Sequence, residues 1–160
     1  MFETIINWLE DQAQRFTEIT RTQEPAFGAV IYTDLLFGVG DHSGIYVGNH
    51  EVVSLRGDGR IRKDSLRTFT GNLTTINTHI YMPCDTSGYP VGSYSAGSKA
   101  IDMIGESRSY HLLVDNCHQF CAGCLHGNFE NSSNFLWMLK DEFEHSQHDQ
   151  ITWKKWRWNS

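Results

Sequence analysis

The chain has 160 residues and a net charge of −6, with 39% hydrophobic and 20% charged residues. This length and composition predict one domain with a packed core and exclude wholesale disorder. The negative charge argues against nucleic acid as a partner, and no run of 18 or more apolar residues offers a membrane-spanning helix.

The environment expected for the protein is reducing. Four cysteines in a chain of this size do not make a disulfide framework. The first residues, "MFETIINWLEDQAQRF", lack the basic start and the long apolar run of a secretory signal. We therefore expect a cytoplasmic protein with free thiols, and peripheral contact with a membrane stays open.

The N-terminal segment has the pattern of an amphipathic helix. Phe2, Ile5, Ile6, Leu9 and Phe16 recur at helical spacing, and acidic residues occupy the other side. We expect this helix to dock on the domain. A membrane-surface role is disfavoured because its charges are acidic.

Strands are predicted next. "FGAVIYTDLLFG" indicates a strand around 28–33. In "HSGIYVGNHEVVSL", two β-branched runs, 44–47 and 51–55, flank "GNH" and predict a hairpin. "RGDGRIRKDSLRTF" indicates a loop followed by a short strand or turn, and "LTTINTHIYMP" indicates another strand.

The remaining segments predict loops and helices. "CDTSGYPVGSYSAGS" is rich in Gly and Ser and predicts a loop, and a helix begins within "SAGSKAIDMIGES". "DNCHQFCAGCLHGN" starts with the cap residues Asp115 and Asn116 and ends at Gly127, which is typical of a helix. "SSNFLWMLKDEF" predicts a capped amphipathic helix that is too short to span a bilayer.

Three cysteines in this helix admit several interpretations. Cys117, Cys121 and Cys124 stand at i, i+4 and i+7, so they share one helix face. A buried stripe is the favoured interpretation for Cys121 and Cys124. A zinc site with His126 lacks a second cysteine pair, because Cys84 stands alone. The spacing also resembles the cluster-binding run of radical-SAM enzymes, but only 36 residues follow Cys124. We expect no metal and no cofactor.

Cys117 is also a candidate nucleophile. If Asp115 or Asn116 caps the helix, Cys117 stands at its first position, where unpaired N–H groups and the helix dipole favour a thiolate. Such a thiolate needs an imidazole to take and return the proton. His42 begins the best-defined strand, from which a side chain can reach a cleft. A histidine at a hairpin mouth with no catalytic role remains the alternative.

These motifs resemble lecithin:retinol acyltransferase-like proteins. "HSGIYVGNHEVVSL" is similar to their His-x-small-Ile-Tyr-Val-Gly hairpin, and "DNCHQF" is similar to their Asn-Cys-Glu-His-Phe motif. The order of the segments agrees over about residues 25 to 127. The resemblance implies an α+β fold with an antiparallel sheet packed with helices, circularly permuted from papain and related to NlpC-type cell-wall peptidases.

We also predict a division of the chain, and the resemblance implies a mechanism. Residues 1–24 would form the helix and a linker, 25–140 the catalytic domain, and 141–160 a tail rich in Trp and basic residues. Cys117 would be the nucleophile and His42 the base. Members of the family transfer or hydrolyse lipid acyl groups through a thioester, and relatives cut amide bonds.

One departure from the family concerns the residue that orients the base. The family has a second histidine twelve residues after the first, and here Ser54 stands at that position. A three-residue turn would put Ser54 opposite His42, whereas a two-residue turn would point it away. Backbone N–H groups at the start of the cysteine helix, near Asn116, would hold an oxyanion, with Tyr32 or Tyr46 as a further donor.

We therefore expect a cysteine-dependent acyl hydrolase or acyltransferase that acts through a thioester on lipid acyl groups. The alternatives are an amidase or peptidase of the NlpC-related type and a catalytically degenerate binding module. The expected partner is an acyl-bearing small molecule or lipid. Trp153, Trp156 and Trp158, interleaved with basic residues, offer peripheral membrane contact. Stacking on nucleic-acid bases and folding back on the domain are the other interpretations of the tail.

Overall fold

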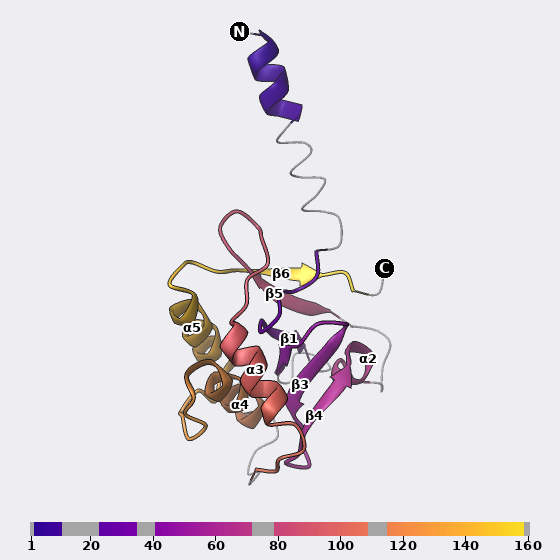
Figure 1. Ribbon diagram of the computed structural model, residues 1–160, viewed down its shortest axis with the longest axis vertical. Helices are drawn as coiled ribbons and strands as arrows, with labels where there is room; N and C mark the ends of the chain where they lie inside the picture. The colour runs from indigo at the N-terminus through magenta and orange to yellow at the C-terminus, as the bar shows by residue number, and fades with distance from the viewer. Residues whose placement is uncertain (1, 11–22, 35–40, 72–78, 109–114, 159–160) are drawn as a thin grey trace.

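The computed structural model describes residues 2–10, 23–34, 41–71, 79–108 and 115–158. Helices pack on a six-stranded antiparallel sheet with the strand order β4-β3-β2-β1-β5-β6 (Figure 1). The predicted α+β class with an antiparallel sheet is confirmed.

The elements follow one another in nearly the order that the sequence predicts. The strands are β1 (Val30–Asp34), β2 (Asp41–Tyr46), β3 (Glu51–Leu55), β4 (Ile61–Ser65), β5 (Ile80–Cys84) and β6 (Thr152–Trp156). The helices are an N-terminal helix over residues 2–10, α2 (Leu66–Phe69), α3 (Tyr94–Asp102), α4 (Asp115–His126) and α5 (Leu136–Gln147).

The predicted hairpin of β2 and β3 is confirmed, and "GNH" forms its turn, because the Val47 N–H donates to the Glu51 carbonyl at 3.0 Å. Gly48, Asn49 and His50 all have positive φ, at 86°, 52° and 59°. Ile45 pairs with Val53 in this hairpin. Extending that register by one step sets Ser54 across from Gly44 and therefore not directly opposite His42.

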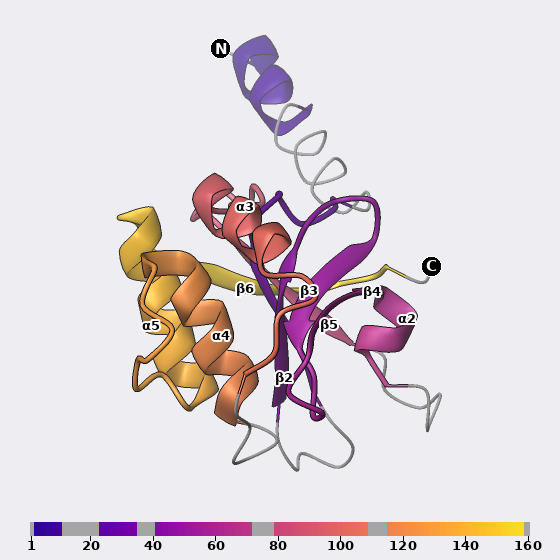
Figure 2. The ribbon, with the colours of Figure 1, turned by 60° about the horizontal axis from the view of Figure 1, so that its bottom comes forward.

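The two faces of the sheet carry different layers. Figure 2 shows α3, α4 and α5 on one side of the strands and α2 on the other. Successive strand residues point to opposite faces, so each strand contributes to both layers. The layer on the α4 side includes Val30, Ile45, Val53, Phe120, Cys121 and Leu139. The layer on the α2 side includes Ile31, Tyr46, Val52, Leu66, Phe69 and Trp156.

The C-terminal segment is part of this sheet. Helix α5 continues across position 140, and β6 pairs with β5 as the sixth strand. Trp156 is 4% exposed, and Trp153 packs on Tyr32 and Phe143 at ring-centroid distances of 5.6 and 5.7 Å. Trp156 is therefore buried in the domain, and Thr152–Trp156 folds back on the sheet, which was one of the interpretations of the tail.

The N-terminal helix does not dock on the domain as expected. Its large apolar side chains are between 48% and 83% exposed, and Figure 1 shows the helix standing apart from the sheet. Phe16, the last residue of the predicted pattern, lies outside the described residues. No helix in the described ranges has the length and apolar character needed to cross a membrane.

Candidate active site

The cysteine helix is present, and its stripe of thiols is buried. Helix α4 begins at Asp115, so Cys117 is its third residue and not its first. Cys117, Cys121 and Cys124 are all 0% exposed, which confirms the predicted stripe for the latter two. Gly127, with φ 87°, follows the last helical residue as predicted.

A small polar cluster joins this helix to β2. The hydroxyl oxygen of Ser43 lies 2.7 Å from Nδ1 of His118 in a buried contact. Cys121 donates its S–H to the same hydroxyl at 3.6 Å. The sulfur of Cys117 lies 3.9 Å from Nδ1 of His118 and 3.9 Å from the carbonyl oxygen of Asp41. Cys117 therefore has an imidazole beside it, supplied by its own neighbour in the chain.

Burial keeps both members of this pair neutral. Burial raises the pKa of the Cys117 thiol above its ordinary value of 9.0, and hydrogen bonds from the backbone and side chain of Ser43 counteract part of that rise. Burial lowers the pKa of His118 to about 4. At neutral pH the resting pair is thus a thiol and an uncharged imidazole, which is the protonation state that general-base catalysis requires.

His42 lies on the other face of the sheet. Because Ser43 contacts α4, the adjacent His42 points away from it, and its ring packs on Phe69 with centroids 4.8 Å apart. Burial, then the charges of Arg56 and His118, lower the pKa of His42 to about 3. The two residues that the resemblance pairs, Cys117 and His42, are therefore not brought into contact in this structure.

Ser54 shares the face of His42. It is 0% exposed, and among the described residues its hydroxyl finds no hydrogen-bond partner. Thr33, which pairs with His42 across β1 and β2, has an equally unpartnered hydroxyl. Ser54 accordingly does not orient an imidazole at the thiol of Cys117.

The predicted oxyanion donors are distributed differently. The Tyr46 hydroxyl donates to Glu24 at 3.0 Å on the face away from α4, and burial raises its pKa to about 12. Tyr32 accepts a hydrogen bond from Lys140 Nζ at 2.9 Å. The side chain of Asn116 lies outside the described residues. Tyr46 is therefore removed from the candidate site.

Sequence reasoning missed Ser43 and His118. Both were visible in principle: His118 follows the cysteine directly, and Ser43 follows His42 in a strand whose faces alternate. The deciding information was which face of β2 meets α4. The sequence of β2 alone does not tell which of its faces meets α4, because both faces of the sheet are covered and β2 is buried on both sides.

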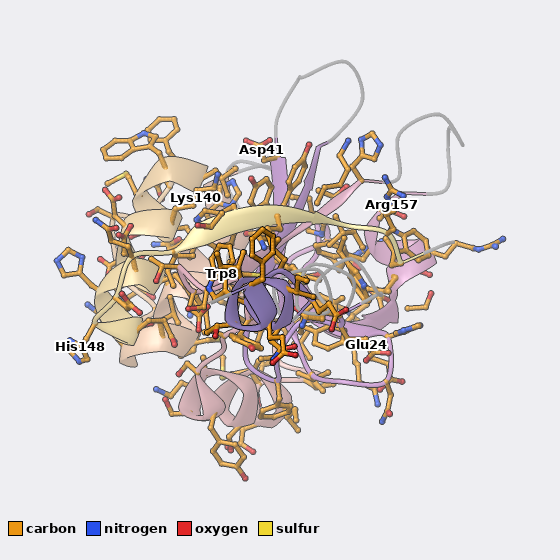
Figure 3. The ribbon with its side chains drawn as sticks, turned by 90° about the horizontal axis from the view of Figure 1, so that it is seen from above. Trp8, Glu24, Asp41, Lys140, His148 and Arg157 are labelled. Atoms are coloured by element: carbon orange, nitrogen blue, oxygen red, sulfur yellow. The ribbon has the colours of Figure 1, made fainter. Side chains whose placement is uncertain are left out.

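Other features of the described residues lie apart from the thiol. No three or more His, Cys, Asp or Glu side chains in the described ranges are arranged to hold a metal ion. An open surface depression of about 490 Å³ is lined by Asp141, Glu144, His145, His148, Asp149 and Gln150. Figure 3 shows His148, from this lining, well away from Asp41, whose carbonyl faces Cys117.

Comparison with known proteins adds no relative. No protein-family model matches the chain, and no curated protein matches it. The site is therefore interpreted from its own geometry and from the motifs in the sequence.

Proposed function

We propose that this protein is a cysteine-dependent acyl hydrolase or acyltransferase in which Cys117 forms a thioester with a lipid acyl group. The observation that carries the proposal is the position of its sulfur, in the first turn of α4 and 3.9 Å from Nδ1 of His118. A thiol at a helix start beside an imidazole is the arrangement that covalent acyl transfer uses.

His118 is the base that the geometry favours. With the ring proton on Nε2, the single lone pair of Nδ1 accepts from the Ser43 hydroxyl, which also hydrogen-bonds Cys117. As the sulfur attacks the acyl carbonyl, this hydroxyl gives its proton to Nδ1 and takes the thiol proton in exchange. The imidazolium then returns that proton to the departing alkoxide. The alcohol is released, and the acyl group remains on Cys117 as a thioester. In the second step, water or an acceptor alcohol gives its proton to the imidazole as its oxygen attacks the thioester carbonyl. The carbon–sulfur bond then breaks, the imidazolium returns the proton to the Cys117 thiolate, and the acid or new ester leaves. The Ser43 hydroxyl stabilises the ring orientation throughout.

The start of α4 would supply the charge stabilisation. The first N–H groups of a helix have no partner within the helix, so those of α4 would be free to donate to the oxyanion of the tetrahedral intermediate. The sulfur is fully buried in this structure, so an acyl carbonyl reaches it only after neighbouring side chains move. Exclusion of water from the resting thiol also follows from that burial.

Membership of the lecithin:retinol acyltransferase-like family, with its permuted papain-like fold, is part of the proposal. It is supported by the chain order of strand β1, the hairpin β2–β3, helix α3 and the cysteine helix α4. It is also supported by the packing of α4 on β2 and β3, the strands of the histidine motif. The base differs from the family's pattern, because the geometry favours His118 and the resemblance favours His42.

Four variants test the proposal. We expect turnover of fatty-acyl ester substrates to disappear in Cys117→Ala and to fall at least a hundredfold in His118→Asn. We expect His42→Asn to retain turnover within a few fold. Cys124→Ala is the matched control, since it removes an equally buried thiol from the same helix face. Turnover that survives Cys117→Ala eliminates the proposal, and a larger loss in His42→Asn than in His118→Asn assigns the base to His42.

A second candidate is a non-catalytic binding module, which the complete burial of Cys117 favours. An acyl-thioester adduct at Cys117, trapped at acidic pH with an activated ester and located by mass spectrometry, supports the enzyme. Absence of any adduct together with absence of turnover supports the module. A panel of ester and peptide substrates separates the lipid hydrolase from an NlpC-like amidase.

A further inference from the structure

The N-terminal helix presents a wide apolar face that nothing in the described part of the chain covers. Phe2 is 83% exposed, Trp8 61%, Ile5 54%, Leu9 52% and Ile6 48%. Exposed apolar side chains of this size mark a binding site when they gather on one face. Figure 3, which looks down on this helix, shows Trp8 on its surface.

The apolar face is half of the helix. At 100° per residue, the apolar side chains run from Trp8 at one edge to Ile6 at the other, an arc of about 160°. The opposite face carries Glu3, Asn7 and Glu10. A helix that enters a protein groove uses a narrower stripe of anchors. A half-apolar, half-polar helix suits a flat boundary between water and hydrocarbon.

The size of the face argues against self-association. A stable protein interface buries about 1,200–2,000 Å² in total. Five side chains on a nine-residue helix present on the order of a few hundred Å². The apolar faces of two such helices together bury less area than a stable protein interface requires. Reversible partition into a lipid interface has no such minimum area.

We propose that the N-terminal helix docks the protein on a lipid surface, with Phe2, Ile5 and Leu9 at the centre of the buried face. Trp8 lies at the margin of the face, where its indole N–H reaches the headgroup layer. The charges define the surface. Glu3 and Glu10 are repelled by anionic headgroups, so the helix selects zwitterionic lipid. This inference stands independently of the proposed chemistry at Cys117.

Vesicle sedimentation with the full chain tests the inference. We expect the protein to pellet with phosphatidylcholine vesicles. Ile5→Glu should weaken that partition at least tenfold, while Asn7→Glu, which adds the same charge on the polar face of the same helix, should change it less than threefold. Replacing a third of the lipid with phosphatidylglycerol should weaken binding at low salt, and added salt should restore it, because screening removes the repulsion.

Each other outcome overturns the inference. These outcomes are no pelleting with vesicles, an equal loss in Ile5→Glu and Asn7→Glu, stronger binding to anionic vesicles, or an Ile5-dependent dimer in analytical ultracentrifugation without vesicle binding. Cys117→Ala should bind vesicles as the wild type does. Failure of the lipid docking is thereby distinguished from failure of the chemistry. Unchanged thermal unfolding of both helix variants shows that the domain is intact.

Discussion

Ser43 and His118 are joined by a buried contact of 2.7 Å between a strand and a helix that lie 75 residues apart in the sequence. The contact satisfies the ring of a histidine that is 2% exposed and sets it beside the sulfur of Cys117. The same hydroxyl accepts the S–H of Cys121. The hydroxyl of Ser43 therefore both orients the ring of His118 in the candidate site and holds α4 against β2.

Removing the Ser43 hydroxyl should destabilise the fold. Ser43→Ala leaves a buried imidazole nitrogen without its partner, which costs about 1–3 kcal/mol in the free energy of unfolding. Urea denaturation measures that free energy for the wild type, Ser43→Ala, His118→Asn and the double variant. We expect the double variant to lose less than the sum of the single losses, because the two residues share one interaction.

Two outcomes would contradict this account. Strict additivity in the cycle shows that the hydroxyl and the ring do not interact. A single-variant loss below a few tenths of a kcal/mol shows that the contact is exchanged for water at no cost. Ser87→Ala is the comparison for an exposed serine, since its side chain lies on the surface.

The stability of the protein should decrease as the pH falls from about 6.5. The pKa of His118 is lowered to about 4 and that of His42 to about 3, against an ordinary value of 6.5. Between these values the unfolded chain binds protons that the folded chain does not, so stability is complete above about pH 6.5 and is lost as the pH falls toward about 4 and 3. Each imidazole adds a slope of up to about 1.4 kcal/mol per pH unit.

Denaturation at several pH values checks the sign and the source of this slope. Carboxylates also titrate in the range, so the informative quantity is the difference between the wild type and His118→Asn, which should lose part of the slope. Identical slopes in the wild type and His118→Asn would contradict the burial of a neutral His118.

Alkylation should distinguish the three thiols of α4. Burial raises the pKa of Cys117 above 9.0 and raises that of Cys121 further, while the pKa of Cys124 is about 12. The thiolate is the reactive form. We expect the rate of iodoacetamide modification at Cys117 to be still rising at pH 9, and modification of Cys121 and Cys124 to follow only global unfolding. Peptide mapping by mass spectrometry assigns the sites.

A plateau of the Cys117 rate below pH 8 would show a stabilised thiolate and would replace the neutral pair by an ion pair. Cys117→Ala is the control that identifies its peptide. Modification of Cys121 at the same rate as Cys117 would show that the helix opens as a unit, because these two residues are one turn apart on the same face.

The fold was largely accessible from the sequence, and the site only partly. The β2–β3 hairpin and helix α4 carry strong local signals: a glycine-centred turn between β-branched runs, and a helix that ends before Gly127. The stripe of cysteines follows from helical spacing alone. The pairing of Cys117 with His42 depended on which face of β2 meets α4, which is a tertiary fact. Alternation places Ser43 there instead, and His42 against Phe69.

The N-terminal helix and the C-terminal strand show the same limit of prediction from sequence, with opposite outcomes. Both are amphipathic or aromatic segments whose sequence admits either docking or exposure. The basic residues around Trp156 suggested a surface role. The indole of Trp156 is nevertheless buried, and it packs on the ring of Tyr46 with the two ring centroids 5.7 Å apart. The helix with Trp8 suggested docking, yet it is exposed. Periodicity identifies an apolar face but does not identify what covers it.

Gly28 lies just before β1, where the chain approaches the start of α3. Of the glycines in the described residues, it should tolerate substitution least. It has φ 79°, and a Cβ built on it would lie 1.8 Å from the carbonyl oxygen of Ser93. Gly48 is the matched control, because it has φ 86° with nothing within 4 Å of the corresponding position.

Alanine at Gly48 should cost about 1 kcal/mol for the left-handed backbone alone. Alanine at Gly28 should cost that strain plus several kcal/mol, because the obstructing atom is backbone and Gly28 N–H donates to the Tyr46 carbonyl at 2.8 Å. Thermal and urea unfolding of the two variants measure the difference, and equal losses would show that β1 and α3 are not packed as closely as 1.8 Å implies.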